Sequence, residues 1–126
     1  MERKKDIIRR KGENISPGDI ERVVSRHENV LECSAIGIKS GLGEEEIALF
    51  MVTKKKFEDI LEFLKWLDSE LPYYMMPSVL NFVDSLPKTS NYKIQRSKLR
   101  EGNVQVIERV DVVKLGFKPT KPLGRQ

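Results

Sequence analysis

The segment that most constrains the fold is residues 46–53, because it is apolar on both faces of an extended chain. Its alternate residues form two apolar sets, Ile47, Leu49 and Met51 on one side and Ala48, Phe50 and Val52 on the other. A strand of this kind has to be covered on both sides, so it belongs in the middle of a sheet. The segment therefore predicts a β-sheet with other layers packed against it.

The remaining segments suggest further strands and helices around that strand. In chain order we expect a short strand at 6–10, a turn at 11–14, a helix opening at Ser16-Pro17, a strand at 30–39, a helix at 57–71, a strand at 79–83 and a short helix at 94–100. This order predicts an α+β fold, with a small central β-sheet of about three strands, helices packed on it and an N-terminal β-hairpin. Residues 101–126 are expected to form a C-terminal tail that docks loosely or frays.

The composition excludes several classes of protein. The chain has 126 residues, one cysteine and one histidine. Cys33 alone cannot form an intrachain disulfide or a cysteine-based metal cluster, and His27 alone cannot build a His-rich site, so no metal site is expected. No apolar run approaches the ~20 residues of a membrane span, and the first residues lack the apolar core of a secretory signal. We expect a cytoplasmic protein that does not bind a membrane.

The net charge of +4 is concentrated at the two ends of the chain. Basic ends attract phosphate groups, although a solvated terminus explains the same pattern. The acidic run at residues 44–46 is expected to be solvated.

Two loops stand out by their residue types. Residues 9–16 read RRKGENIS, in which Gly12 allows close approach of a ligand and the basic flank suits an anion. A plain hairpin turn accounts for this loop equally well. Residues 86–96 read LPKTSNYKIQR and place three cations, Lys88, Lys93 and Arg96, on a loop that Pro87 anchors on one side. The composition of residues 84–92 is that of a mobile segment.

The same two regions resemble motifs of the adenylate-forming enzyme superfamily, which includes acyl-CoA synthetases, aryl-CoA ligases, peptide-synthetase adenylation domains and luciferases. Residues 3–17, RKKDIIRRKGENISP, followed by Asp19-Ile20-Glu21, resemble its interdomain hinge and hairpin loop. Residues 86–100 resemble its lysine loop, and the AIGI sequence at residues 35–38 also fits. The resemblance covers residues 2 to about 100. It implies that residues 1–100 form the mobile C-terminal domain, with a hinge segment at 1–6.

The resemblance also implies roles for individual residues. Enzymes of this superfamily first join a carboxylate to ATP, giving an acyl-adenylate and pyrophosphate, and a thiol then displaces AMP. Between the two steps the small domain rotates. By resemblance Lys93 is the adenylation lysine, Lys5 is the hinge residue and Arg3 faces the nucleotide. The thiol-channel loop, which binds coenzyme A, would consist of Gly12, Glu13 and Asn14.

The implied function is that of an ATP-dependent acid–thiol ligase domain that is inactive alone. ATP, Mg²⁺ and coenzyme A are expected in the full-length enzyme, with none bound tightly to this domain. The expected partner is a large N-terminal domain, either in the same chain or as a separate subunit. Neither the carboxylic acid nor the choice between coenzyme A and a carrier-protein thiol follows from this sequence.

One departure from the family pattern leaves two alternatives open. The family usually has glycine before the catalytic lysine, where this chain has Tyr92. A catalytically idle interaction domain is therefore one alternative. A small βαββαβ RNA-binding module is another, but it needs exposed aromatic side chains on central strands, and Phe50 and Phe82 are expected to be core residues. No nucleic acid partner is expected.

Overall fold

The computed structural model describes residues 6–41 and 43–120. A two-stranded hairpin comes first, formed by β1 (Ile8–Arg10) and β2 (Glu13–Ile15). Helix α1 (Pro17–Val24) follows, and β3 (Val30–Gly41) and β4 (Glu44–Thr53) form a long antiparallel pair. After α2 (Ile60–Glu70) and a 3-10 turn at Tyr73–Met75 come β5 (Val79–Val83), α3 (Arg96–Arg100) and β6 (Val106–Asp111). The predicted α+β fold class and N-terminal hairpin are confirmed.

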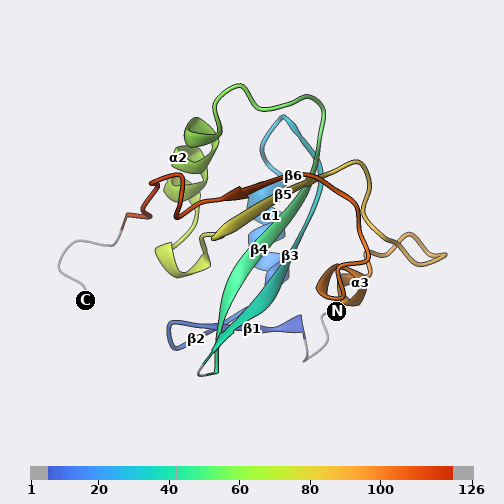
Figure 1. The fold of residues 1–126 in the computed structure, drawn as a ribbon, viewed down its shortest axis with the longest axis horizontal. Coiled ribbons are helices and arrows are strands. Elements are labelled where there is room, and N and C mark those ends of the chain that lie inside the picture. Colours follow the sequence, from blue (N-terminus) through green and yellow to red (C-terminus); the bar gives the residue numbers. More distant parts are fainter. Residues whose placement is uncertain (1–5, 42, 121–126) are drawn as a thin grey trace.

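The main sheet has the order β3-β4-β5-β6, with β4 and β5 parallel and the other neighbours antiparallel (Figure 1). Strand β4 is internal, as its two apolar faces predicted. The sheet has four strands where the sequence predicted about three, because residues 106–111 pair with β5. The expectation that the tail frays is therefore wrong for this segment, which is held by a ladder with β5 and by the buried side chain of Val112.

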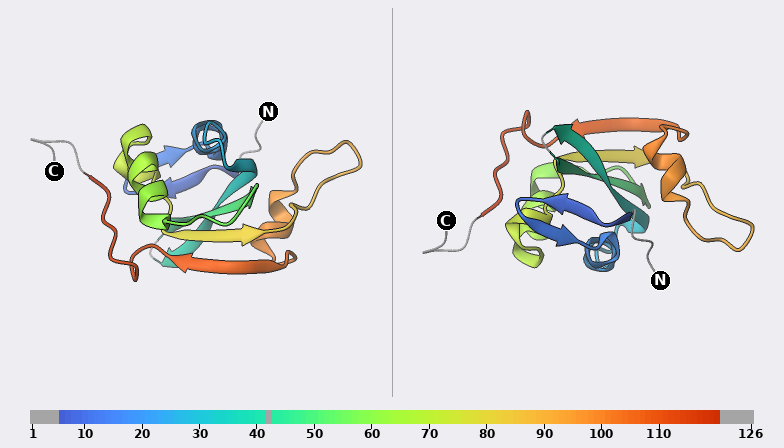
Figure 2. Two further views of the ribbon diagram at one scale, coloured as in Figure 1. Left: turned by 90° about the horizontal axis from the view of Figure 1, so that it is seen from above. Right: turned by 90° about the horizontal axis from the view of Figure 1, so that it is seen from below.

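The two faces of the sheet are covered by different elements. One face carries the larger core, in which Ile47, Leu49 and Met51 of β4 pack with α1, α2 and the apolar side chains of the hairpin. The other face carries a smaller core around Ala48 and Phe50, covered by α3 and the loop before it. Figure 2 shows the hairpin and both longer helices on one side of the sheet, and the loop after β5 extending from the body of the domain.

Helix α2 is shorter than expected because Asp59 begins it. The Asp59 carboxylate accepts a hydrogen bond from the backbone N–H of Glu62 at 3.3 Å, which satisfies one of the free N–H groups of the first turn. Phe57 lies before the helix and packs against Phe63, with ring centroids 4.7 Å apart. Its side chain thus contributes to the core without belonging to the helix.

Candidate functional site

The hairpin turn is built from two residues in the left-handed backbone region. Arg10 pairs with Glu13, so Lys11 and Gly12 form a two-residue loop with φ of 50° and 78°. Positive φ at both central positions defines the turn that matches the twist of the flanking strands. A Cβ added at Gly12 would meet no atom within 4 Å, so the backbone conformation, not space, favours glycine there.

The edge of the hairpin is held by two glutamates of β4. The backbone N–H groups of Arg9 and Lys11 donate to Glu45 Oε1 at 2.9 Å and to Glu44 Oε1 at 2.7 Å. These N–H groups lie on the strand edge that β2 does not use, and carboxylates satisfy them with charge-assisted bonds. The acidic run was expected to be solvated, and this expectation is wrong for these two side chains, because the fold brings the hairpin edge onto them.

A buried arginine fixes the hairpin from beneath. Arg10 is 8% exposed and donates from Nη2 to Glu46 Oε1 at 2.9 Å. Its Nη1 also donates to the carbonyl oxygens of Tyr74 and Met76 in the segment between α2 and β5. The hairpin is therefore a rigid feature of the domain. Gly12, Glu13 and Asn14 lie together on its exposed side, with Asn14 Oδ1 accepting from Arg9 Nη1 at 3.0 Å.

The lysine loop is a closed hairpin. The Thr89 N–H donates to the Lys93 carbonyl at 2.8 Å, the Lys93 N–H donates to Thr89 Oγ1 at 3.2 Å, and the Gln95 N–H donates to the Pro87 carbonyl at 2.8 Å. Lys88 also forms an ion pair with Glu32 of β3. The expectation of a loop anchored on one side only is wrong, because residues on both of its limbs are tied down.

Lys93 itself is exposed at the end of this loop. Within residues 6–41 and 43–120 its ammonium has no ion-pair or hydrogen-bond partner. A cation on a backbone that is fixed at both limbs can be presented to an anion outside the domain without first breaking an internal ion pair.

Tyr92 occupies a backbone conformation that suits glycine. Its φ is 63° and its side chain is 84% exposed. Tyrosine in place of the family's glycine therefore changes the side chain but not the backbone conformation, which is the left-handed one that glycine adopts without strain. The tyrosine ring extends into solvent beside Lys93.

Two further residues of the motifs form contacts that the sequence did not predict, and Arg96, expected as a loop cation, lies in helix α3. Arg96 donates from Nη2 to Glu21 Oε1 at 2.7 Å and from Nε to Glu21 Oε2 at 3.2 Å, which joins α3 to α1. Asp6 is 9% exposed and accepts from Arg100 Nη1 at 2.9 Å. The signal that could have found these pairs is an acid and a base at fixed places in the two motifs, separated by more than 70 residues. The predicted hinge and nucleotide-facing residues, Lys5 and Arg3, lie outside the described residues.

The two predicted motifs approach the sheet from opposite faces. Ile8 and Ile15 anchor the hairpin in the larger core, whereas Leu86, Ile94 and Leu99 anchor the lysine loop and α3 in the smaller one. The structure does not bring Lys93 and residues 12–14 together into one site. A single reaction centre could meet both only if the domain turned between two poses.

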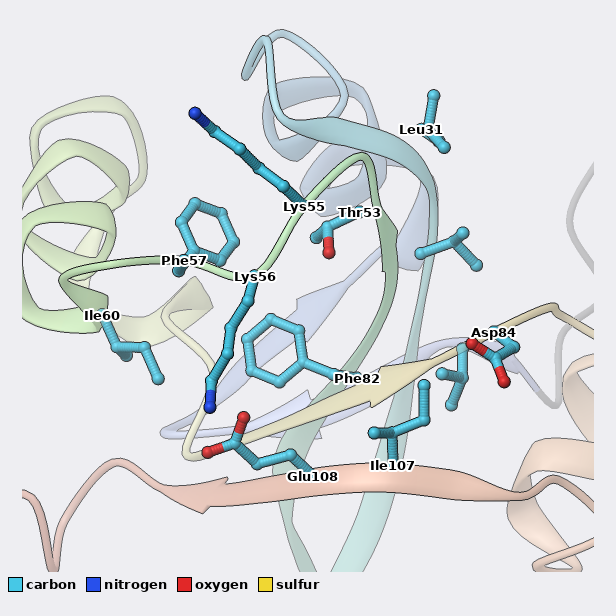
Figure 3. Close-up of a pocket in the computed structure, with 12 residues that line it drawn as sticks. Leu31, Thr53, Lys55, Lys56, Phe57, Ile60, Phe82, Asp84, Ile107 and Glu108 are labelled. Carbon is cyan, nitrogen blue, oxygen red and sulfur yellow. The ribbon is translucent and has the colours of Figure 1, made fainter.

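A separate cavity of about 620 Å³ opens where β4 and β5 end (Figure 3). Phe57 and Phe82 form part of its apolar wall, and Lys56 extends across it toward Glu108. None of the residues predicted for function lines it. Phe50 is 5% exposed and is a core residue, as expected. Phe82 is only partly buried, because it packs against the core and against Phe57, with ring centroids 6.0 Å apart, but also lines this cavity.

Cys33 is not a nucleophile in this fold. Burial raises the pKa of its thiol to about 11, so the thiolate is scarce at neutral pH. The described residues also contain no group of three or more His, Cys, Asp or Glu side chains arranged to hold a metal ion, and no described helix has the length and apolarity needed to cross a membrane.

Comparison with known proteins identifies the family. Residues 19–93 match the family described as the AMP-binding enzyme C-terminal domain. Among curated proteins, a peroxisomal butyrate–CoA ligase of Arabidopsis thaliana is 35% identical over 114 residues, which is 87% of this chain and 20% of that protein. A long-chain-fatty-acid–CoA ligase of Escherichia coli O157:H7 is 36% identical over 101 residues, 80% of this chain and 18% of that protein. The chain belongs to the AMP-binding enzyme C-terminal domain family.

Solved structures agree with this assignment. A Mycobacterium tuberculosis fatty acyl CoA synthetase superposes with a TM-score of 0.73 at 28% identity, over 80% of this chain and 20% of that one. Apo MatB from Rhodopseudomonas palustris gives a TM-score of 0.70 at 32% identity, over 79% of this chain and 20% of that one. The chain thus spans about a fifth of the length of the relatives it matches, and it corresponds to the C-terminal domain of acyl-CoA synthetase-like ligases.

Proposed function

We propose that this chain works as the mobile domain of an AMP-forming acid–thiol ligase, to which it supplies the adenylation lysine and one wall of the thiol channel. The observation that carries the proposal is the placement of Lys93 and of the hairpin turn at Gly12 on opposite faces of one sheet, with Lys93 exposed and without an ion-pair partner among residues 6–41 and 43–120. A domain with this layout can serve two successive reactions by turning over. Lys5, in the segment before Asp6, is the proposed hinge residue.

Lys93 suits the first half-reaction. A carboxylate oxygen attacks the α-phosphorus of ATP, and pyrophosphate leaves with the electron pair of the broken P–O bond. Negative charge builds on the phosphoryl and carboxyl oxygens during this step, and a positioned ammonium stabilises it in a site from which water is excluded. Arg3 is proposed to add a second cation to the nucleotide.

The hairpin suits the second half-reaction. A thiol sulfur attacks the acyl carbonyl carbon and forms the C–S bond, its proton passes to solvent, and AMP leaves with the electron pair of the broken C–O bond. Gly12 carries no side chain at the turn, so a narrow thiol arm could pass beside it, with Glu13 and Asn14 along the passage. The hydrogen bonds that hold the hairpin to Glu44, Glu45 and Glu46 would keep that passage open.

The partner that this function requires is a large N-terminal domain, in the same chain or in a separate subunit. It would hold ATP, the carboxylic acid and Mg²⁺, which reaches the site with the nucleotide phosphates. The thiol is proposed to be that of coenzyme A, with a carrier-protein thiol as the other outcome. We propose a cytoplasmic location, without a nucleic acid or membrane partner.

The geometry at Tyr92 favours this function over an idle interaction domain. The loop retains a glycine-like backbone and leaves the Lys93 ammonium exposed, so the tyrosine need not disable it. An RNA-binding role has no comparable support, because Phe50 is buried and Phe82 packs in the aromatic cluster with Phe57.

The deciding experiment uses the ligase that contains this chain and measures each half-reaction separately. Lys93→Ala should slow pyrophosphate release by ~10²–10³, the usual loss for one preorganised charge contact. Thioester formation from supplied acyl-adenylate should be nearly unchanged. Lys98→Ala, which removes a nearby exposed lysine of α3, is the matched control. Normal adenylation by the Lys93→Ala enzyme would refute the proposal and favour the idle domain.

A further inference from the structure

Two arginines of α3 tie the lysine loop to the first described residue of the chain. Arg96 and Arg100 are one helical turn apart, so both guanidinium groups leave the same side of the helix. Arg100 Nη1 donates to Asp6 Oδ1 at 2.9 Å, and Arg96 Nη1 lies 3.5 Å from Asp6 Oδ2. Asp6 is almost fully buried, and these two cations compensate its charge.

The same network is anchored in the main fold through Glu21. Its carboxylate receives two bonds from Arg96 and also accepts from the backbone N–H of Ala35 at 2.9 Å and the hydroxyl of Ser34 at 3.2 Å. Glu21 thereby links α1 and β3 to α3. A shift of α3 relative to the sheet would break several charge-assisted bonds together.

Lys93 is three residues before Arg96, and the intervening backbone is fixed. Gln95 donates to Pro87 across the base of the loop, and Ile94 pairs with Lys88. The loop therefore continues α3 as a stiff arm, and the position of Lys93 relative to Asp6 is set by the arginine network.

We propose that Asp6 is a positioning residue that, through Arg96 and Arg100, holds Lys93 at a fixed place relative to the body of the domain. With Asp6 bound to Arg96 and Arg100, the lysine loop and the body of the domain move together as one rigid body when the domain turns. This inference rests on the proposed function, since it concerns delivery of Lys93 to the adenylation site. Asp6 does not touch substrate and acts only through the arginines.

The consequence is a selective effect on one half-reaction. Without the carboxylate, the two guanidinium groups lose their common acceptor and the arm is less firmly placed. A misplacement of about 1 Å can reduce a rate by ~10²-fold. The hairpin is held by Glu44, Glu45 and Glu46, which are not members of the arginine network, so we expect the thiol step to be spared.

The test compares variants of the ligase that contains this chain. Asp6→Asn should lower the kcat of adenylation ~10–100-fold while the KM for ATP and thioester formation from supplied acyl-adenylate stay within about 2-fold. Arg26→Gln is the matched control, because it removes an ion pair with Glu70 far from the loop. Arg100→Gln, at a partly exposed position, provides the same readout if the Asp6 variant folds poorly. The double variant should be no slower than the slower single one, since both remove the same contact.

Each outcome has a distinct meaning. Normal adenylation by the Lys93→Ala enzyme would mean that the proposed function fails. If Lys93→Ala abolishes adenylation while Asp6→Asn and Arg100→Gln match the control, only the positioning role is overturned. Equal losses in both half-reactions, seen with both Asp6→Asn and Arg100→Gln, would show a purely structural role and would also overturn it. Hydrogen exchange at the Lys93 and Gln95 amides of the chain should be at least ~10-fold faster in Asp6→Asn than in the control if the arm is loosened.

Discussion

The backbone N–H of Tyr92 donates to the carbonyl of Thr89 at 2.9 Å, and this turn holds Tyr92 at a φ of 63°. Thr89 also accepts from Lys93 through its hydroxyl, so the turn that strains Tyr92 is the one that orients the lysine. The strain is therefore located one residue from the group proposed to act on ATP, where a firmly held backbone is most useful.

Replacing Tyr92 separates backbone strain from loss of function. Holding a residue other than glycine in the left-handed region costs about 1–2 kcal/mol of folding free energy. Glycine avoids this strain, but it loses more backbone entropy on folding, which offsets about 0.5–1 kcal/mol of the gain. Tyr92→Gly should thus leave the free energy of unfolding within about 1 kcal/mol and retain adenylation. Tyr92→Val should lower stability by about 1–2 kcal/mol, because β-branched residues tolerate positive φ poorly. Chemical denaturation checks both values, and loss of adenylation in the glycine variant would contradict the interpretation.

Gly12 can be tested against a glycine with the same geometry. Gly12 and Gly102 both have a φ of 78°, and an added Cβ at either would meet no atom within 4 Å. Valine at each position should therefore lower stability by a similar ~1–2 kcal/mol. Only Gly12→Val should slow thioester formation more than adenylate formation in the ligase. Equal effects of the two variants on both half-reactions would contradict the assignment of the hairpin turn to the thiol channel.

Local pattern in the sequence predicted the elements whose signals are local. The strand at 79–83 was predicted with the bounds that the structure shows. The segment at residues 46–53, which is apolar on both faces, lies in the internal strand β4. A turn at residues 11–14 was predicted from residue type, but it is confined to Lys11 and Gly12, because Glu13 and Asn14 pair with β1. These features depend on neighbours a few residues away, where periodicity and turn chemistry are informative.

Long-range pairing explains what the sequence did not predict. The β6 segment alternates weakly and becomes a strand only because β5 offers a free edge to it. The ion pair of Arg96 with Glu21 and the hydrogen bonds from the hairpin to Glu44 and Glu45 likewise join residues far apart in the chain. A charged residue is read from sequence as solvated unless its distant partner is known, and the folded chain supplies that partner.

The isolated chain should not form acyl-adenylate. It has a complete core, but Lys93 is its only proposed group for the chemistry of that step among residues 6–41 and 43–120. Lys93 can stabilise charge only on a nucleotide that another domain holds in place. Purified chain with ATP, Mg²⁺ and butyrate should release no pyrophosphate above the rate of the Lys93→Ala chain. Release that depends on Lys93 would contradict the need for a large domain.

Removing β6 tests the corrected view of the tail. A chain ending at Gly102 loses the ladder with β5 and the buried Val112, together with Val110 packed against the core. The buried Val112 contributes about 1.5–3 kcal/mol and the partly buried Val110 adds to this, so the free energy of unfolding should fall by at least about 1.5 kcal/mol. The newly open edge of β5 should also promote association, visible in light scattering. A chain ending at Thr120 is the length control and should behave as the parent. Unchanged stability of the shorter chain would mean that β6 does not hold the sheet.

Cys33 predicts a specific loss of stability at high pH. Burial raises the pKa of its thiol from 9.0 to about 11, so the folded state favours the protonated form. Below pH 9 both states are protonated and this stabilising contribution is fully present. As the pH rises from 9 to 11 the unfolded chain releases the proton more readily, and the contribution falls by about 2 kcal/mol. Cys33→Ala lacks this group, so its stability relative to the parent should improve between pH 8 and pH 10.5 in denaturant titrations. The folded parent should also resist alkylation by iodoacetamide at pH 8. Rapid alkylation, together with the same pH dependence of the free energy of unfolding in both chains, would show that the thiol is accessible.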